Sequence, residues 1–576
     1  MKEIKESLQK NILNAIKQIS DNIELSASDI IMEIPPKPEL GDVAFPMFPY
    51  SKILKKAPAA IALQLIEKIE DKEHQYKAIG PYVNVFIAKQ QIIKKTLQKV
   101  IDEKEKYGFG QGRKDEKIML EFSCPNTNKP LHLGHLRNDS IGESISRILK
   151  ANRANVYKVN LINDRGVHIC KSMLAYKELG KGTTPESENI KSDHFVGNYY
   201  VEFSKLAKTD TDAEKRAQAM LVAWENGDNE IKELWAKMNK WTIDGIEETY
   251  KKTGIVFDKV YYESQTYSEG KKEVLKGLEK GIFYKDETNT IWIDLMDINL
   301  DKKVLLRGDG TSIYLTQDIG TAIKRHEDWA FDTLIYVVAS EQQYHFKVLF
   351  NVLAKLGYKW AANLYHLSYG LVNLPEGRMK SREGTVIDAD DLLKELSDMA
   401  NEEIKSRERE EFVGDIKTTS EKIALGALNY FLLATTPTKD MIFNPAESLS
   451  FTCNTGPYLQ YMGARISSLL KKYGKPIEIE NIDIALLKEE DEWEIIKMIN
   501  EFPEKILEAG KELNPAIITS FMYELCKKFS KYYHDNSVLN NESEELVNAR
   551  VALCGAVGQT LKNCMELTGI PYLEAM

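Results

Sequence analysis

Short apolar runs alternate with amphipathic helical patterns between residues 115 and 400, and this alternation constrains the fold more than any other feature. The apolar runs span 118–122, 156–162 and 334–338. A helical pattern over 134–150 follows the first run. Strands that alternate with helices form a parallel sheet covered by helices on both faces. We therefore predict an α/β, Rossmann-type domain over residues 113–404, with a more polar, helical insertion around 166–260.

The regions on either side have different patterns. The N-terminal one begins with apolar residues at helical spacing, namely Ile4, Leu8, Ile12, Ile16 and Ile19. After a break at Gly80 and Pro81, residues 82–87 alternate like a strand. Beyond about residue 405 the strand signals stop and helical patterns continue. We expect an α+β domain over 1–112 and an all-α bundle over 405–576.

Composition limits the class of protein. No apolar run approaches the roughly 20 residues that a membrane helix needs, and the first helix lacks the apolar core of a signal peptide. The six cysteines form no Cys-x-x-Cys pair, which favours reduced thiols over a zinc site or disulfides. The net charge of -10 weighs against nucleic-acid binding, although a large acidic chain can carry a local basic stripe. We expect a cytoplasmic enzyme with no membrane partner and no structural metal.

The turn at 122–135, between the first strand and its helix, is the most informative segment. Ligands of open parallel sheets bind at such strand ends, where free N–H groups and the helix dipole favour phosphate. His132 and His135 are able to donate hydrogen bonds to anionic oxygens, Lys129 adds a positive charge, and Gly134 allows close approach. One other interpretation is a capped turn with two surface histidines. Another is a metal site, but zinc needs at least three protein ligands and no nearby Cys, Asp or Glu completes the set.

Residues 125–137 read Pro-Asn-x-x-Lys-Pro-x-His-x-Gly-His-Leu-Arg. This string resembles the His-x-Gly-His signature of class I aminoacyl-tRNA synthetases in its arginyl form; the tetrapeptide alone also occurs in some nucleotidyltransferases and pantothenate-synthetase-like ligases. Residues 378–385 resemble the second signature of this class, with Ser381 in place of its second lysine. In the arginyl family Lys129 is thought to supply that missing charge. Without the first motif, 378–385 would be interpreted as a solvated basic loop.

The resemblance to arginyl-tRNA synthetases implies ATP-dependent ligation of L-arginine to tRNA(Arg) through an arginyl-adenylate, whose formation needs bound tRNA. It implies four catalytic residues: Lys129, His132, His135 and Arg382. The implied ATP-binding residues are Gly134, His345 and Met379. The implied arginine-binding residues are Asn126, Glu263, Tyr314, Asp318 and Gln342. Carboxylates and a phenol suit a planar cation, and they reject neutral analogues strongly. Mg²⁺ would accompany ATP.

The same resemblance covers nearly the whole chain. It implies that 1–112 contacts the tRNA elbow and that 405–576 binds the anticodon. The implied tRNA-binding residues are Asn84, Tyr458, Tyr461, Tyr533 and Met576. Tyr458 and Tyr461 share a helix face, which suits unpaired bases but also suits core packing. DNA is not an expected partner, and the family implies a monomer.

Three alternatives differ in class. One is a class I synthetase for another amino acid, although a cysteinyl enzyme needs zinc and large aliphatic-specific members usually carry a long editing insertion. The second is an adenylate-forming ligase without an RNA partner, for which the flanking domains would have no use. The third is an inactive RNA-binding paralogue, which the intact Lys129, His132, His135, Asp318 and Gln342 argue against.

Overall fold

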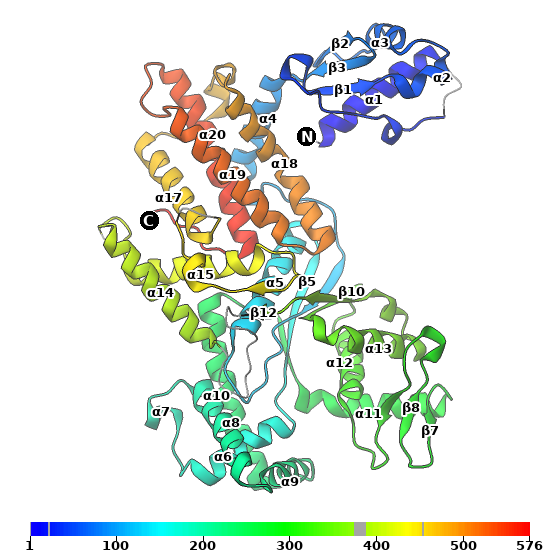
Figure 1. Cartoon of the computed structure of the whole chain (residues 1–576), viewed down its shortest axis with the longest axis vertical. Helices are drawn as coiled ribbons and strands as arrows, with labels where there is room; N and C mark the ends of the chain where they lie inside the picture. Colours follow the sequence, from blue (N-terminus) through cyan, green and yellow to red (C-terminus); the bar gives the residue numbers. More distant parts are fainter. Residues whose placement is uncertain (1, 21–23, 374–386, 410, 452–453) are drawn as a thin grey trace. The chain divides into compact units, whose positions relative to one another are not determined.

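The computed structural model describes residues 2–20, 24–373, 387–409, 411–451 and 454–576 (Figure 1). The chain divides into two compact units. One comprises Met1–Gly108, Leu469–Lys505 and Glu524–Leu561, and the other comprises Phe109–Ser468, Ile506–Tyr523 and Lys562–Met576.

The second unit is built on the predicted parallel sheet. Its strands are β4 (Lys117–Glu121), β5 (Asn155–Ile162), β6 (Lys259–Tyr262), β10 (Thr333–Ala339) and β11 (Leu364–Tyr369). They lie in the order β11-β10-β4-β5-β6, and every neighbouring pair is parallel. The chain passes from β4 to β5 on one side and reaches β10 on the other side much later. The order therefore reverses between β4 and β10, the place where open α/β sheets bind ligands.

Helices cover both faces of this sheet, because successive strand residues point to opposite faces. Ile118 and Leu120 of β4 pack into one apolar core, whereas Met119 between them packs into the other. The covering helices include α5 (Leu133–Ala151), α11 (Glu263–Glu279), α12 (Tyr314–Asp328), α13 (Gln343–Lys355), α14 (Ala389–Ser406) and α15 (Ile416–Leu433). The α/β, Rossmann-type prediction is confirmed.

The segment between β5 and β6 is helical, as its polar amphipathic pattern predicts. It comprises α6 (Val167–Leu179), α7 (Pro185–Glu188), α8 (Ser192–Thr209), α9 (Ala213–Glu225) and α10 (Asn229–Thr253). Figure 1 shows α6, α8, α9 and α10 gathered into one group, and they share a core rich in aromatic side chains.

Several short strands escape the sequence patterns. β7 (Tyr284–Lys285), β8 (Ile291–Ile293) and β9 (Lys303–Leu306) form a small antiparallel sheet. β12 (Val372–Asn373) pairs with β13 (Met441–Ile442), so one strand does occur beyond residue 405. Two to four residues are too few to show the alternation from which strands are predicted.

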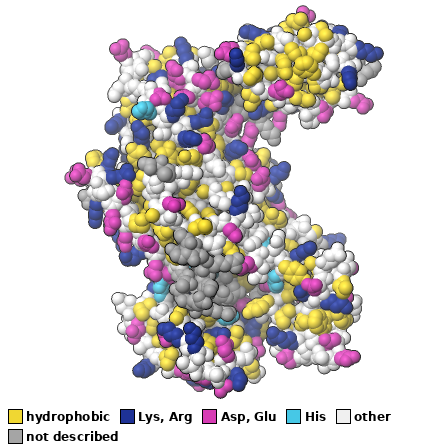
Figure 2. Space-filling view, in the orientation of Figure 1, with side chains coloured by type: hydrophobic (Ala, Val, Ile, Leu, Met, Phe, Trp, Pro, Cys, Tyr) yellow, Lys and Arg dark blue, Asp and Glu magenta, His cyan; other side chains and the backbone are white. Residues whose placement is uncertain are grey.

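The N-terminal residues form the predicted α+β arrangement. β1 (Val43–Pro46), β3 (Tyr82–Phe86) and β2 (Gln75–Ile79) make an antiparallel sheet in that order. Its helices are α1 (Lys2–Ile19), α2 (Ser51–Leu54), α3 (Pro58–Ile66) and α4 (Lys89–Glu103). Figure 2 shows apolar side chains gathered over these elements, and Ile34, Phe48 and Leu63 are more than half exposed.

Four long helices form the predicted C-terminal bundle. They are α17 (Gly456–Tyr473), α18 (Glu490–Glu512), α19 (Ala516–Asp535) and α20 (Glu544–Thr568). The fully buried Glu492 of α18 accepts hydrogen bonds from Tyr532 of α19 (3.0 Å) and Arg550 of α20 (3.1 Å), which ties three helices together. Among the described residues, no helix has both the length and the apolar character needed to cross a membrane.

Candidate active site

A cleft of about 390 Å³ opens where the strand order reverses. Its walls include Ser123 and Cys124 after β4 and the end of β10. The Asn138 side chain of α5 joins these strands, since its Oδ1 accepts from the Ser123 amide (2.6 Å) and its Nδ2 donates to the Val337 carbonyl (2.8 Å). The floor of the cleft is therefore fixed by a buried amide between two parallel strands.

Ser123 and Cys124 turn the chain sharply out of β4. Both have positive φ angles, 76° and 48°, which side-chain-bearing residues rarely adopt. Asn160 Oδ1 accepts from the Cys124 amide (3.0 Å), and Asn163 Nδ2 donates to the Cys124 carbonyl (3.1 Å). Such strain persists only where surrounding contacts hold it, and it is typical of ligand-binding turns.

The two histidines cap α5 and each other. The Gly134 amide donates to Nδ1 of His132, and the His132 amide donates to Nδ1 of His135, both at 3.1 Å. Burial and the nearby Lys129 lower the pKa of His132 to about 3, and burial and His132 hold the pKa of His135 well below its usual range. Both rings are therefore neutral near pH 7. Because each Nδ1 accepts, each Nε2 carries the proton and is a donor.

Lys129 borders a neighbouring pocket of about 190 Å³, which His132, His194 and Asp388 also line. Burial lowers the pKa of the Lys129 ammonium, and no described residue accepts a hydrogen bond from it. Asn126 is exposed and lies in the same turn, in a bridge with Asn163. The turn thus gathers a cation and two neutral donors at the start of a helix, an arrangement that suits an anion.

A pair of acidic side chains, here called the acidic pocket, comprises Glu263, directly after β6, and Asp318 of α12. Glu263, the first residue of α11, is 7% exposed, and burial raises its pKa to about 7. Asp318 of α12 lies close enough to raise that pKa further, and its Oδ2 is 2.6 Å from Nε2 of His345 on α13. A buried ion pair between Arg325 and Glu121 fixes α12 against β4. The pocket suits a small cation.

Two other residues predicted to bind arginine, Tyr314 and Gln342, are exposed. Tyr314 begins α12 and is 70% exposed. Gln342 is exposed at the end of a 3₁₀ turn over Ser340–Gln342, after β10. Among the described residues, no hydrogen bond or ion pair joins either side chain to Glu263 or Asp318. Met379 and Arg382 lie outside the described residues.

The predicted tRNA contacts lie in β3, in α17, in α19 and at the C-terminal residue. Asn84 is 3% exposed, and its Nδ2 donates to the Leu40 carbonyl (2.6 Å). Tyr458 and Tyr461 are both half-buried on α17, and the Tyr458 ring is 6.1 Å from that of Tyr523. Tyr533 packs 5.9 Å from Phe529, and Met576 packs against the core of the second unit.

Sequence reasoning missed three side chains that shape the site. Asn138 joins β4 to β10 as described above. Arg137 is fully buried and donates to the carbonyls of Leu371, Pro437 and Lys439. Arg165 pairs with Glu225 and lies 3.8 Å from Glu263. Arg165 lies three residues beyond the end of the predicted strand at 156–162, and this position was the one available signal, because strand ends carry ligands.

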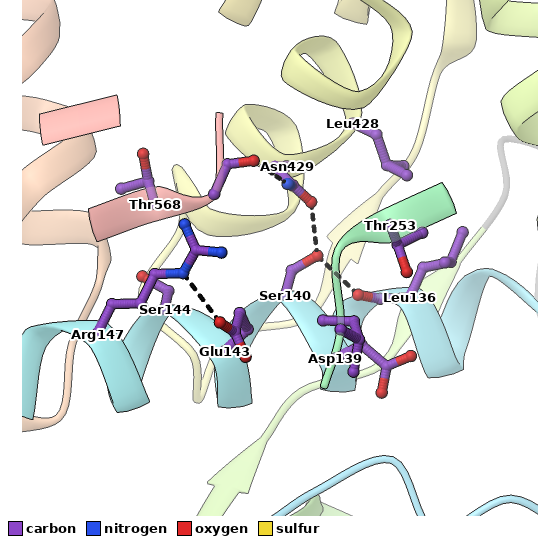
Figure 3. A pocket seen from close by; sticks show the side chains of 12 residues that line it. Leu136, Asp139, Ser140, Glu143, Ser144, Arg147, Thr253, Leu428, Asn429 and Thr568 are labelled. Atoms are coloured by element: carbon purple, nitrogen blue, oxygen red, sulfur yellow. Dashed lines mark hydrogen bonds and ion pairs between the residues drawn. The ribbon is translucent and has the colours of Figure 1, made fainter. Parts of the chain in front are cut away.

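Two further features do not act as a second ligand site. A pocket beside α5, drawn in Figure 3, has a volume of about 20 Å³, which suits one water molecule. Asp193, His194 and Asp390 have metal-ligand spacing. However, the ammonium of Lys191 already lies 3.0 Å from Asp193 and 2.6 Å from Asp390, which makes this group an ion-pair network.

Comparison with known proteins identifies relatives of every part of the chain. Family models match residues 6–87 (arginyl tRNA synthetase N terminal domain), 96–445 (tRNA synthetases class I (R), catalytic domain) and 459–576 (DALR anticodon binding domain). The arginine–tRNA ligases of Treponema denticola and Borrelia hermsii are 54% and 50% identical to it, each over the whole of both chains. The fold is similar to that of the Thermus thermophilus arginyl-tRNA synthetase, with a TM-score of 0.79, 24% identity and 99% of each chain covered.

Proposed function

Because this chain belongs to the class I arginyl-tRNA synthetase family, it ligates L-arginine to tRNA(Arg) with ATP, and we propose that two neighbouring sites divide this work. The turn before α5 binds and polarises the phosphates of ATP, and the acidic pocket selects arginine. The observation that carries the proposal is the pair of neutral histidines. Their Nε2–H groups are donors at the helix start that lines the cleft of the sheet.

In the first step, the carboxylate of arginine attacks the α-phosphate of ATP, and pyrophosphate leaves. His132 and His135 donate to phosphate oxygens, while Lys129 balances the charge that develops there; no covalent bond to the protein is needed. Gly134 allows the nucleotide to approach the backbone, and His345 borders it. Arg382 and Met379 belong to the same proposal on their sequence alone.

The acidic pocket selects the amino acid. Glu263 and Asp318 pair with the guanidinium, and Tyr314 packs on it or hydrogen-bonds to it. Asn126 and Gln342 bind the α-amino group. A neutral analogue lacks the guanidinium N–H groups from which these carboxylates accept, which explains how arginine is chosen without a separate editing step.

In the second step, a terminal ribose hydroxyl of tRNA(Arg) attacks the carbonyl of the adenylate, and AMP leaves. We propose that 1–112 contacts the tRNA elbow, with Asn84 fixing the loop there, that 113–404 carries the chemistry, and that 405–576 binds the anticodon. Its proposed contacts are Tyr458, Tyr461, Tyr533 and Met576, since aromatic faces stack on unpaired bases.

The remaining parts of the proposal concern conditions and partners. Adenylate formation needs bound tRNA. Mg²⁺ enters with ATP as part of the substrate, and no structural zinc is required. The enzyme acts as a monomer in the cytoplasm, without a DNA or membrane partner.

Arginine-dependent ATP–pyrophosphate exchange tests this proposal, measured with and without tRNA(Arg) against a panel of other amino acids. We expect exchange with arginine, and only in the presence of tRNA. Exchange with arginine alone would contradict the tRNA requirement and leave the ligase function standing. Exchange with another amino acid would contradict the assigned specificity.

A further inference from the structure

Arg165 carries an enclosed guanidinium at the edge of the acidic pocket. It follows β5 in the loop that leads to α6, and its side chain is 7% exposed. The guanidinium carbon lies 4.2 Å from the ring centre of Tyr267 and 5.6 Å from that of Trp224, and Nη2 donates to Glu225 at 2.5 Å. Two rings and a carboxylate therefore hold this side chain in one place.

Gln317 connects this guanidinium to Glu263. In the amide orientation that satisfies both groups, Gln317 Oε1 accepts from Arg165 Nη1 (2.7 Å) and Gln317 Nε2 donates to Glu263 Oε1 (2.8 Å). Gln317 is 8% exposed, so water does not readily replace these bonds. One oxygen of Glu263 is thus held from the protein side. No described residue hydrogen-bonds to the other, Oε2.

The charges around Glu263 act in opposite directions on its pKa. Burial raises the pKa of Glu263, Asp164 and Asp318 raise it further, and Arg165 opposes them. The charged groups that face this carboxyl, directly or through a partner, are Asp164 and Arg165 of the loop after β5, Asp318 of α12, Glu225 of α9 and His345 of α13. Arg165 is the one permanent cation among them, because arginine keeps its proton at physiological pH whereas histidine does not.

We propose that Arg165 is a positioning residue for arginine selection: through Gln317 it holds one oxygen of Glu263 and presents the other to the guanidinium of the substrate. This inference rests on the proposed role of Glu263 in binding arginine. Arg165 touches no substrate in this scheme. Its own guanidinium takes one side of the carboxylate, so the substrate guanidinium meets a carboxylate that is already oriented before binding.

Two variants break the link while keeping a cation, and a third, Arg165→Met, removes the cation as well. Gln317→Met removes both hydrogen bonds at similar volume and leaves Arg165 in place. Arg165→Lys keeps a cation but loses the planar fork. Arg216→Lys in α9 is the matched control, because Arg216 pairs with Glu178 and Asp210 on the exposed side of the same helical group. The measurements are kcat, KM for arginine and KM for ATP in tRNA(Arg) aminoacylation from pH 6 to 8.5.

We expect Gln317→Met and Arg165→Lys to raise KM for arginine roughly tenfold or more, the size of a lost hydrogen bond to a charged group. KM for ATP and kcat should change by less than about twofold, since the phosphate-binding turn is untouched. In Arg165→Met, the pH below which KM for arginine rises should move upward, because Glu263 loses its opposing cation. Arg216→Lys should behave as the parent enzyme.

An unchanged KM for arginine in folded Gln317→Met and Arg165→Lys would overturn the inference. So would a joint loss of kcat and of both affinities, which indicates general damage. Glu263→Gln separates this failure from failure of the proposed function. If Glu263→Gln leaves KM for arginine unchanged, the assignment of Glu263 itself is wrong. If it raises KM while the other two variants do not, only the role of Arg165 is wrong.

Discussion

The imidazole Nε2 of His345 lies 2.6 Å from Oδ2 of Asp318, and this contact joins α13 to α12 at the edge of the acidic pocket. Burial alone would lower the pKa of His345, but the hydrogen bond and charge of Asp318 outweigh it and raise that pKa. Glu263 is likewise paired with Arg165. Both carboxylates proposed to bind the substrate guanidinium therefore already have a cationic partner within the chain.

This pairing predicts that arginine binding strengthens as pH rises. Below about pH 7 the Glu263 carboxyl is largely protonated and neutral. The raised pKa of His345 keeps its ring charged, and competing for Asp318, to a higher pH than is usual for histidine. KM for arginine should fall by roughly tenfold from pH 6 to pH 8, since one protonation governs about one decade per pH unit. KM for ATP, measured in parallel, is the control. A KM for arginine that stays constant over this range would contradict the assignment of Glu263.

The function of the two histidines of the turn should not depend on pH in this range, in contrast to arginine binding. His132 and His135 are neutral throughout this range because their pKa values are lowered far below it. Replacing either with asparagine should reduce the rate of tRNA-dependent ATP–pyrophosphate exchange by roughly 10²–10³-fold, the usual effect of losing one aligned donor. His326→Asn, whose ring stacks on Trp360, is the control and should keep full exchange. A loss that varies with pH between 6 and 8 would show that these rings act as cations.

Arg137 should matter for stability more than its place in a catalytic motif indicates. Its fully buried guanidinium donates to three backbone carbonyls, and burial lowers its pKa to about 10. Arg137→Lys leaves some of these carbonyls without a donor and should destabilise the second unit by about 2–4 kcal/mol, measured by urea unfolding. Arg147→Lys, on the same helix but in partly exposed ion pairs, should change stability by less than about 1 kcal/mol. Equal effects of the two variants would contradict the role of the buried contacts.

The sequence predicted what depends on local periodicity and on position along a strand. The strand, turn and helix around His132 follow from apolar spacing and from the motif, and the structure places that turn at the reversal of strand order. The link from Arg165 through Gln317 to Glu263 was not predictable in the same way. Arg165 and Gln317 are far apart in the chain, and such a pairing leaves no periodic trace. Gln317 even lies next to Asp318, a residue that the family resemblance implies, yet only the tertiary contact reveals its function.

The buried carboxyl of Asp139 should make the stability of the protein depend on pH. Asp139 is 2% exposed beside the small pocket of Figure 3, and burial raises its pKa to about 7 against the opposing effect of Ser123. A carboxyl whose folded pKa exceeds the unfolded value contributes stability at low pH, and that contribution is lost as pH rises through about 7. Asp139→Asn lacks this charge. Its Tm minus that of the parent should therefore increase from pH 5 to pH 8 and then level off, whereas a constant difference would show that Asp139 stays ionised.

Two glycines of α5 should separate activity from stability. A Cβ at Gly134 would lie 3.0 Å from Cε1 and 3.1 Å from Nδ1 of His132, so the ring must shift while the core stays intact. A Cβ at Gly142 would instead meet the buried ring of Phe122 at 2.3 Å. Alanine is favoured over glycine in a helix by about 1 kcal/mol, so Gly134→Ala should keep or slightly raise Tm. The displaced His132 ring should reduce exchange by roughly tenfold or more, because such donors act only when aligned.

Gly142→Ala should show the reverse, with a stability loss of about 1–3 kcal/mol from overpacking. The informative comparison is the exchange rate of each variant at a temperature where both are folded. If Gly134→Ala kept full exchange, the capping geometry between Gly134 and His132 would have no role in positioning the imidazole. If instead Gly134→Ala lost exchange and Tm together, the turn would be part of the folding core, and the effect on ATP would follow from unfolding rather than from a misplaced Nε2.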